Sequence, residues 1–353
     1  MYNSRQKKAF IETVKAETTK KRLRIMFDAI ASYEEAHDTD ICNVDVKLYP
    51  EILMCCYPQQ RFETFYLHYR ALINYRALCI VRNLIDQVEF FSNDGNTTDL
   101  KERQDILENL YDFFEDRNNS VKIRTPGECL AVFQKKVLPD CGASKTSLNP
   151  DEYKMGYIIL RYLGLDDDRM AMVTTDEVLA LVKFDQFKVD GVIIGVYDKK
   201  VKEFLLRIAT VRKIETSYKL RVRFTNLSHK YFLAQEEDVT AQLRKDRIKK
   251  IRNTINKKIS MDGIKNVPSL PDISFYGTIY RMCIGEHAIN QDATVKYIPD
   301  EYWIPLYNSY ANLEKNKREF SKEDSRFGAK GVEIKRCFVK ECEFLEQNNE
   351  WPH

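Results

Sequence analysis

The sequence predicts a mainly α-helical protein with a small antiparallel β-meander, an α+β fold in two domains. Apolar residues recur at helical spacing through most of the chain. Only the segment of about 180–235 contains short β-branched runs that alternate apolar and polar residues between turns. With 353 residues the chain is long enough for two domains of ordinary size, each with its own core.

The composition is that of a globular protein rather than a fibrous or disordered one. Hydrophobic residues make up 44% and charged residues 31%, and the net charge is only +3. Without a signal peptide or an apolar run of roughly 18 residues, we expect a cytoplasmic protein with no membrane contact. Nine cysteines form no CxxC pair and only five histidines are present. We therefore expect reduced thiols and neither a metal nor another cofactor.

The first domain, residues 1–95, is predicted to contain about four helices. In the segment 5–36 the apolar residues Leu23, Met26, Phe27 and Ile30 follow helical spacing, and Thr18 or Thr19 is expected to cap a helix. A short helix is expected around 50–56. A long helical pattern without glycine or proline then spans 61–91.

A linker helix is predicted between the two domains, within residues 96–120. Turn residues at 92–98 precede it, and its many carboxylates argue against contact with nucleic acid. We expect this acidic helix to contact basic residues of the same chain or of a partner.

The second domain, residues 121–353, is predicted to be helical around a three-stranded sheet. Thr125 followed by Pro126 is typical of a helix start. The runs VDGVIIGVYD, EFLLRIATVRK and SYKLRVRFTN, separated by DKK and ETS, predict the three strands. A basic helix is expected at 241–260, and mostly helical structure from 269 to 345.

This order of elements resembles the tyrosine recombinases, the phage integrase family, over most of the chain. The segment GLDDDRMAMVTTDEV (164–178) carries the resemblance, because Met170, Met172 and Val178 fall on the apolar positions of the family's pattern. The resemblance implies a SAM-like core-binding domain and a catalytic-like domain that clamp double-stranded DNA between them. In the family a tyrosine attacks the DNA backbone, and arginine, lysine and histidine side chains stabilise the transition state.

The positions that carry this chemistry in the family hold other residues here. Asp166 stands at the first arginine position, and Ile273 and Tyr276 replace the histidine and arginine of the HxxR motif. Either Tyr307 or Tyr310 lies at a plausible distance for the family's nucleophile. Since the loss of one preorganised donor costs roughly 10²–10³ in rate, we expect no strand-transfer activity.

In length, domain order and these departures the chain resembles the catalytically silent, recombinase-derived repressors of SPβ-like Bacillus phages. The resemblance implies a sequence-specific DNA-binding regulator, a phage or prophage transcriptional repressor that controls lysis versus lysogeny. Its partners would be operator DNA, a second copy docked through the tail 311–353, and a small anti-repressor protein. In a bacterial host it would be associated with the nucleoid.

The candidate DNA-binding residues are basic or aromatic and lie in three regions. Those of the first domain are Lys20, Lys21, Arg22, Arg24, Arg61, Tyr69, Arg70 and Arg76. The turn expected to supply the family's hairpin lysine contains Lys199 and Lys200. The basic helix contributes Arg244, Lys245, Lys249, Lys250, Arg252, Lys257 and Lys258, which could neutralise phosphates.

The sequence leaves two alternative functions open. One is a working integrase with a rearranged site built from Arg169, Arg281, His287 and either Tyr307 or Tyr310. The other is a protein-interaction subunit that binds no DNA.

Overall fold

The chain divides into two compact units in a computed structural model. The structure describes residues 3–56, 61–82, 100–118, 122–141, 146–218, 221–261, 267–289, 298, 302–311, 328–348 and 351. Unit 1 takes its described residues from 1–119, 300–304 and 320–336, and unit 2 takes the rest. The predicted domain boundary at residue 95 lies outside the described residues.

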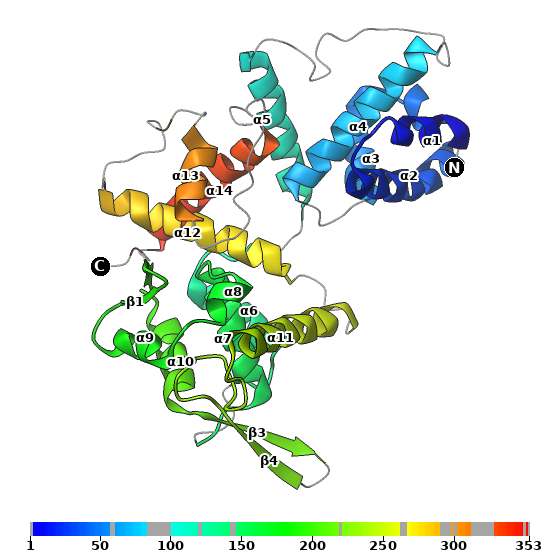
Figure 1. Cartoon of the computed structure of the whole chain (residues 1–353). Coiled ribbons are helices and arrows are strands. Elements are labelled where there is room, and N and C mark those ends of the chain that lie inside the picture. The colour runs from blue at the N-terminus through cyan, green and yellow to red at the C-terminus, as the bar shows by residue number, and fades with distance from the viewer. Residues whose placement is uncertain are drawn as a thin grey trace. The chain divides into compact units, whose positions relative to one another are not determined.

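Unit 1 is built from helices (Figure 1). They are α1 (Ser4–Glu12), α2 (Glu17–His37), α3 (Tyr49–Cys56), α4 (Phe62–Val81) and α5 (Leu100–Arg117), with short 3₁₀ turns at Ile41–Asn43 and Val46–Leu48. The expected set of about four helices before residue 90 is therefore present in the described part. The predicted apolar stripe of α2 is confirmed, since its four members are at most 2% exposed. The predicted cap is wrong, because α2 begins after Ala16 and no side chain caps it.

A buried ion cluster joins α1 to α2 and to the turn that follows it. The side chains of Lys7 and Glu34 are fully buried and form an ion pair, and Lys7 Nζ lies 3.5 Å from Asp40 Oδ2. The backbone N–H groups of Ile41 and Cys42 donate to Glu34 and Asp40 respectively. Tyr75 of α4 donates its hydroxyl proton to Asp40 at 3.3 Å. The cluster therefore ties three segments of unit 1 together.

Helix α5, which the sequence predicts as a linker, packs into the core of unit 1. Tyr111 and Phe114 contact Phe62 ring to ring, and Leu107 is fully buried. On its exposed side, Glu108 accepts hydrogen bonds from Lys335 and Arg336. The acidic helix thus contacts basic residues of its own chain.

Unit 2 is arranged around helix α7 (Pro150–Tyr162). Helices α6 (Pro126–Lys136), α10 (Lys199–Thr210), α11 (Ala241–Met261) and α12 (Leu270–Ile289) all contact α7. Asn149 and Glu152 form a capping box that starts α7. The predicted start of α6 is confirmed, because Thr125 accepts a hydrogen bond from Glu128 N and Pro126 is the first helical residue.

The predicted three-stranded sheet is wrong. Two separate antiparallel hairpins stand in its place, β1 (Gln186–Val189) with β2 (Val192–Gly195) and β3 (Lys213–Tyr218) with β4 (Arg221–Asn226). The run EFLLRIATVRK, expected as a strand, lies mostly in α10. The buried residues of α10, which are Val201, Leu205, Ile208 and Ala209, recur at helical spacing, and Asp198 caps the first turn of this helix.

The hairpin of β3 and β4 projects from unit 2 (Figure 1) and has two chemically different faces. Directly paired residues of an antiparallel ladder share a face. Arg221 and Arg223 therefore lie on one side with Thr216, and Val222 and Phe224 on the other. Val222 is 53% and Phe224 52% exposed. We call this hairpin the basic ribbon.

Five further elements complete the described chain. These are α8 (Asp167–Met170), α9 (Thr175–Leu179), a 3₁₀ turn at Ala180–Val182, α13 (Trp303–Tyr310) and, towards the C-terminus, α14 (Ala329–Gln347). The first residues of α13 and α14 belong to unit 1 and the others to unit 2. In α14 the residues Ile334, Phe338 and Leu345 are buried, so the tail helix packs on its own chain. In the described ranges, every helix is too short or too polar to span a membrane.

Candidate nucleic-acid interface

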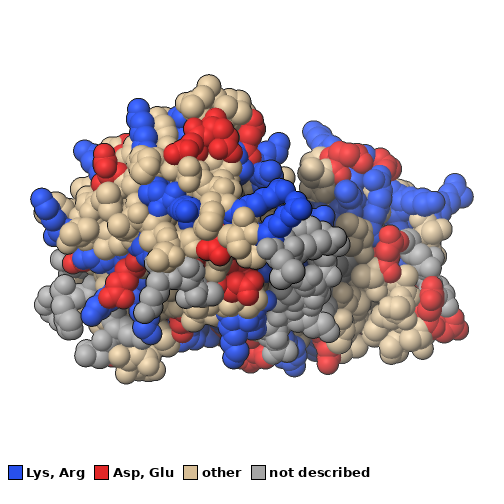
Figure 2. Space-filling model, turned by 90° about the horizontal axis from the view of Figure 1, so that it is seen from below, with Lys and Arg blue, Asp and Glu red and all other residues tan. Residues whose placement is uncertain are grey.

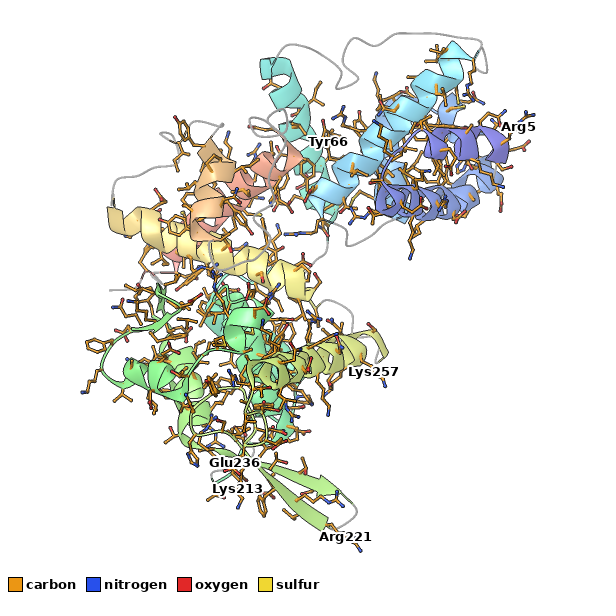
Figure 3. All side chains as sticks on the ribbon, viewed as in Figure 1. Arg5, Tyr66, Lys213, Arg221, Glu236 and Lys257 are labelled. Atoms are coloured by element: carbon orange, nitrogen blue, oxygen red, sulfur yellow. The ribbon has the colours of Figure 1, made fainter. Side chains whose placement is uncertain are left out.

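The densest cationic surface of unit 1 is formed by α1, α2 and the turn between them. Residues 3–24 contain eight Lys or Arg residues but only two acids, Glu12 and Glu17. Five of these cations are exposed and have no acidic partner among the described residues: Arg5, Lys8, Lys15, Lys21 and Arg22. We call this set the N-terminal cationic surface. Basic side chains gather at the right of Figure 2, and Arg5 is labelled in Figure 3.

The sequence identified only part of this surface. Lys21 and Arg22 are exposed as expected, whereas Lys20 pairs with Glu12, and Arg24 bonds to both Glu12 and Glu17. Arg5, Lys8 and Lys15 were missed, although the excess of cations over acids from residue 5 onward was visible in the sequence. The exposed cations without an acidic partner therefore lie on α1, on α2 and in the turn between them, rather than on α2 alone.

The candidates on α4 have different positions. Arg76 Nη1 donates to the carbonyl oxygens of Cys42 and Val44 at 2.9 and 2.7 Å, so this guanidinium fixes a turn instead of facing DNA. Tyr69 is buried in the core of unit 1, which removes it from the candidate readers. Arg61 and Arg70 are half-buried.

His68 of α4 is buried and is not exposed for base reading. Burial, together with a smaller effect of the positive charge of Arg22, lowers the pKa of His68 to about 4. The folded protein therefore holds this imidazole neutral well below its ordinary pKa near 6.5.

We expect this imidazole to reduce stability as the pH falls from 6.5 to 4. In that window the unfolded chain binds a proton that the folded chain does not. The stability that the neutral imidazole of His68 contributes is therefore fully present only above pH 6.5. Comparing urea unfolding of the protein and of His68→Phe at about pH 7 and pH 4.5 isolates the effect. The difference in unfolding free energy between the two proteins should change by about 2 kcal/mol in favour of the variant at the lower pH. An unchanged difference would assign the acid sensitivity to other groups.

Most cations of α11 have partners inside unit 2. Arg244 is buried, donates to the carbonyl oxygens of Ala171 and Val239, and its guanidinium carbon lies 3.6 Å from the ring centroid of Tyr231. It is therefore a structural residue, contrary to the sequence prediction. The other paired candidates of α11 are Lys245 with Asp168, Arg252 with Asp167, and Lys258 with Asp151.

The outward side of α11 keeps three lysines. Lys249, Lys250 and Lys257 are exposed and, within the described ranges, have no acidic partner. Lys257 is labelled in Figure 3. The basic ribbon adds the exposed Arg221 and Arg223, which lie in a segment that the sequence predicts only as a strand and not as a DNA contact. In the sequence, arginines alternate with Val222 and Phe224, and this alternation predicts a strand with one basic face and one apolar face.

The three aspartates at 166–168 have structural roles. Asp166 is the N-cap of α8 and accepts a hydrogen bond from Arg169 N at 2.8 Å. Asp167 accepts from Tyr157 at 3.1 Å and pairs with Arg252, and Asp168 Oδ1 lies 2.9 Å from Lys245 Nζ. Asp167 and Asp168 therefore pair with cations of α11. Of the matching apolar positions, Met170 and Val178 are buried, whereas Met172 is 47% exposed.

The positions at the HxxR motif are packed against neighbours. Ile273 is fully buried, and Tyr276 contacts Phe275 ring to ring. One residue on, Gly277 of α12 lies against the backbone of Tyr162 in α7, where an added Cβ would overlap the Tyr162 carbonyl oxygen. This close approach of two helices leaves no room for a side chain at Gly277.

The two candidate tyrosines lack the surroundings of an activated phenol. Tyr307 is buried and packs against Phe275, with ring centroids 5.7 Å apart. The hydroxyl of Tyr310 donates to Glu286 Oε1 at 2.9 Å, and burial together with this carboxylate raises its pKa. A raised pKa keeps the phenol protonated, which opposes nucleophilic attack.

The remaining residues of the rearranged-site alternative also have other contacts. Arg281 Nη1 donates to Tyr162 O at 2.9 Å, and its Nη2 donates to Thr278 Oγ1 at 2.8 Å and reaches the backbone carbonyl oxygen of Tyr310 at 3.5 Å. His287 stacks on Trp351, and Arg169 Nε lies 3.8 Å from Asp190 Oδ2. Arg281 thus approaches the backbone of Tyr310 but not its hydroxyl.

Lys199 and Lys200 are exposed, but they open helix α10 instead of lying in a hairpin turn. Asp198 accepts a hydrogen bond from Val201 N at 3.0 Å and so starts a helix where the sequence predicted a turn. Within the described residues, no three His, Cys, Asp or Glu side chains gather as metal ligands would. No protein-family model matches the chain, and no curated protein matches its sequence.

Proposed function

We propose that the protein binds double-stranded DNA through the N-terminal cationic surface and acts as a transcriptional repressor without a catalytic step. The observation that carries this proposal is the set of five exposed cations on α1, α2 and their connecting turn, which lack acidic partners in the described part of the chain. Each phosphate that a cation neutralises releases counterions, and this release favours binding. The outward lysines of α11 and the arginines of the basic ribbon add a second cationic surface on unit 2.

The contacts at the family's catalytic positions support the non-catalytic half of the proposal. Asp166 caps a helix, Ile273 is buried in the core, and Tyr276 packs against Phe275. The hydroxyl of Tyr310 is held by a carboxylate rather than by arginines. A phosphoryl transition state needs preorganised positive charge around the transferring phosphoryl group, whereas Asp166 and Glu286 supply negative charge.

The role in lysis and lysogeny follows from the resemblance to recombinase-derived phage repressors. As a repressor, the protein would hold an operator through base contacts while phosphate contacts set its register. Arg5, Arg22, Arg221 and Arg223 are exposed, and an arginine can make bidentate contact with guanine. Selection of bound fragments from sheared prophage genomic DNA, followed by sequencing, should return a small set of sites near promoters.

Removing two cations of the N-terminal cationic surface should weaken DNA binding and its salt dependence together. For Lys8→Ala/Lys21→Ala we expect about tenfold weaker binding to a selected duplex, because two phosphate contacts are lost. The slope of log K against log salt should become less negative by about 1.8, at 0.9 per phosphate on duplex DNA. Fluorescence anisotropy with a labelled duplex between about 50 and 200 mM salt measures both quantities.

A matched control is Lys135→Ala/Lys183→Ala, which removes two exposed lysines of unit 2 outside both cationic surfaces. Equal losses in the two double variants would reduce the effect to net charge and contradict a defined interface. No shift of any prophage fragment would favour the protein-interaction alternative. A tyrosyl-DNA adduct trapped on a nicked suicide duplex would overturn the non-catalytic half.

A further inference from the structure

Unit 1 contains a pocket of about 370 Å³ beside α4 that the proposed DNA contacts do not use. One stripe of α4 forms its floor, since the lining residues recur at three- and four-residue steps along the helix: Glu63, Tyr66, Leu67, Arg70, Ala71 and Asn74. Phe10 and Leu23 bring walls from α1 and α2. Ile304 and Ala329, from distant parts of the sequence but the same unit, close another side.

The lining is mostly apolar with a few polar groups. Phe10, Leu23, Leu67 and Ile304 present hydrocarbon or aromatic surface, and Tyr66, labelled in Figure 3, adds a largely buried ring. A volume near 370 Å³ is at the lower end of the range for small-molecule sites, which are apolar with a small number of convergent polar groups. The pocket therefore suits a ligand with a compact apolar body.

The charge of the lining selects the other end of that ligand. Arg70 is half-buried at the pocket and, among the described residues, has no hydrogen-bond or ion-pair partner. Among the described residues of the lining, Lys330 supplies a second cation and Glu63 is the single acid. A guanidinium next to an apolar cavity binds a carboxylate with two parallel, charge-assisted hydrogen bonds.

We infer that this pocket binds a small monocarboxylate with an apolar chain, with its carboxylate on Arg70 and its chain against Phe10, Leu23 and Leu67. In this proposal Arg70 contacts the ligand and does not contact DNA. The inference stands on the geometry of unit 1 and does not depend on DNA binding.

Isothermal titration calorimetry of the full chain with octanoate tests the inference, with 1-octanol as the uncharged probe of equal length. Octanoate should bind, and octanol should bind at least tenfold more weakly, because it lacks the charge that Arg70 pairs with. In Arg70→Gln, octanoate should lose about tenfold in affinity while octanol is unaffected. Ala71→Met, which extends a side chain from the floor, should weaken both probes.

Arg82→Gln is the matched control, since it removes an exposed charge beyond the end of α4 and outside the pocket lining. It should bind octanoate as the unchanged protein does. Absence of octanoate binding would overturn the inference, as would equal affinities for octanoate and octanol or equal losses in Arg70→Gln and Arg82→Gln. Circular-dichroism melting curves establish that each variant is folded, and Arg70→Gln keeps the test decisive even where Ala71→Met is not.

Discussion

Replacing Lys7 by Met is expected to lower the unfolding free energy by about 3–5 kcal/mol, the usual cost of breaking a buried ion pair from one side. The side chain of Lys7 is fully buried between the carboxylates of Glu34 and Asp40. Met has a similar volume, so the change removes the charge while little packing is lost. Two carboxylates would then stay in the core without their cation. Urea unfolding followed by circular dichroism measures the loss.

Two further variants separate the charge effect from packing. Lys8→Met changes the neighbouring exposed lysine of α1 and should stay within about 0.5 kcal/mol of the original protein. Glu34→Gln combined with Lys7→Met should cost less than the sum of the single changes, because the neutral amide needs no counter-charge and still accepts from Ile41 N. Additive costs would contradict a coupled ion cluster.

Adding a single methyl group at Gly277 should destabilise unit 2 by about 2–4 kcal/mol. Gly277 is where α12 meets the backbone of Tyr162, and the new Cβ would overlap that carbonyl oxygen. Neither backbone can move away as the end of a flexible side chain could, so the contact between α7 and α12 must open. The intrinsic preference of helices for Ala over Gly, about 1 kcal/mol, offsets only part of this cost. Thermal unfolding of Gly277→Ala gives the value.

Gly331→Ala provides the comparison within another helix. Its added Cβ would meet Ile304 at 3.7 Å, an ordinary contact, so the change should be neutral or stabilise by about 0.5–1 kcal/mol. If Gly277→Ala changed the unfolding free energy no more than Gly331→Ala does, the result would contradict the close approach of α7 and α12 at Gly277.

Local patterns predicted several elements correctly because the deciding residues are close in sequence. The stripe Leu23, Met26, Phe27 and Ile30 repeats at helical spacing, and all four residues are core. Thr125 and Pro126 mark a helix start through a hydrogen bond within the first turn. In both cases the short-range signal and the final packing agree.

The failures arise where contacts from distant segments decide. Residues 203–213 alternate well enough to suggest a strand, but most of them are helical because the buried face of α10 packs against α7 and α9. Lys7 lies in a charged run that is typical of a surface, but the carboxylates of Glu34 and Asp40, which come from later segments, pair with it in the core. The charge of α11 was evident, but Asp151, Asp167 and Asp168, which neutralise part of it, come from far upstream.

Unit 1 takes part of its core from the end of the chain, because Ala329 and Val332 pack among residues of α1–α5. During synthesis the first five helices leave the ribosome long before these two residues exist. During this time the core of the early helices is incomplete, and these helices are exposed to chaperones and proteases. A fragment that stops after α5 would remain permanently in that unfinished state.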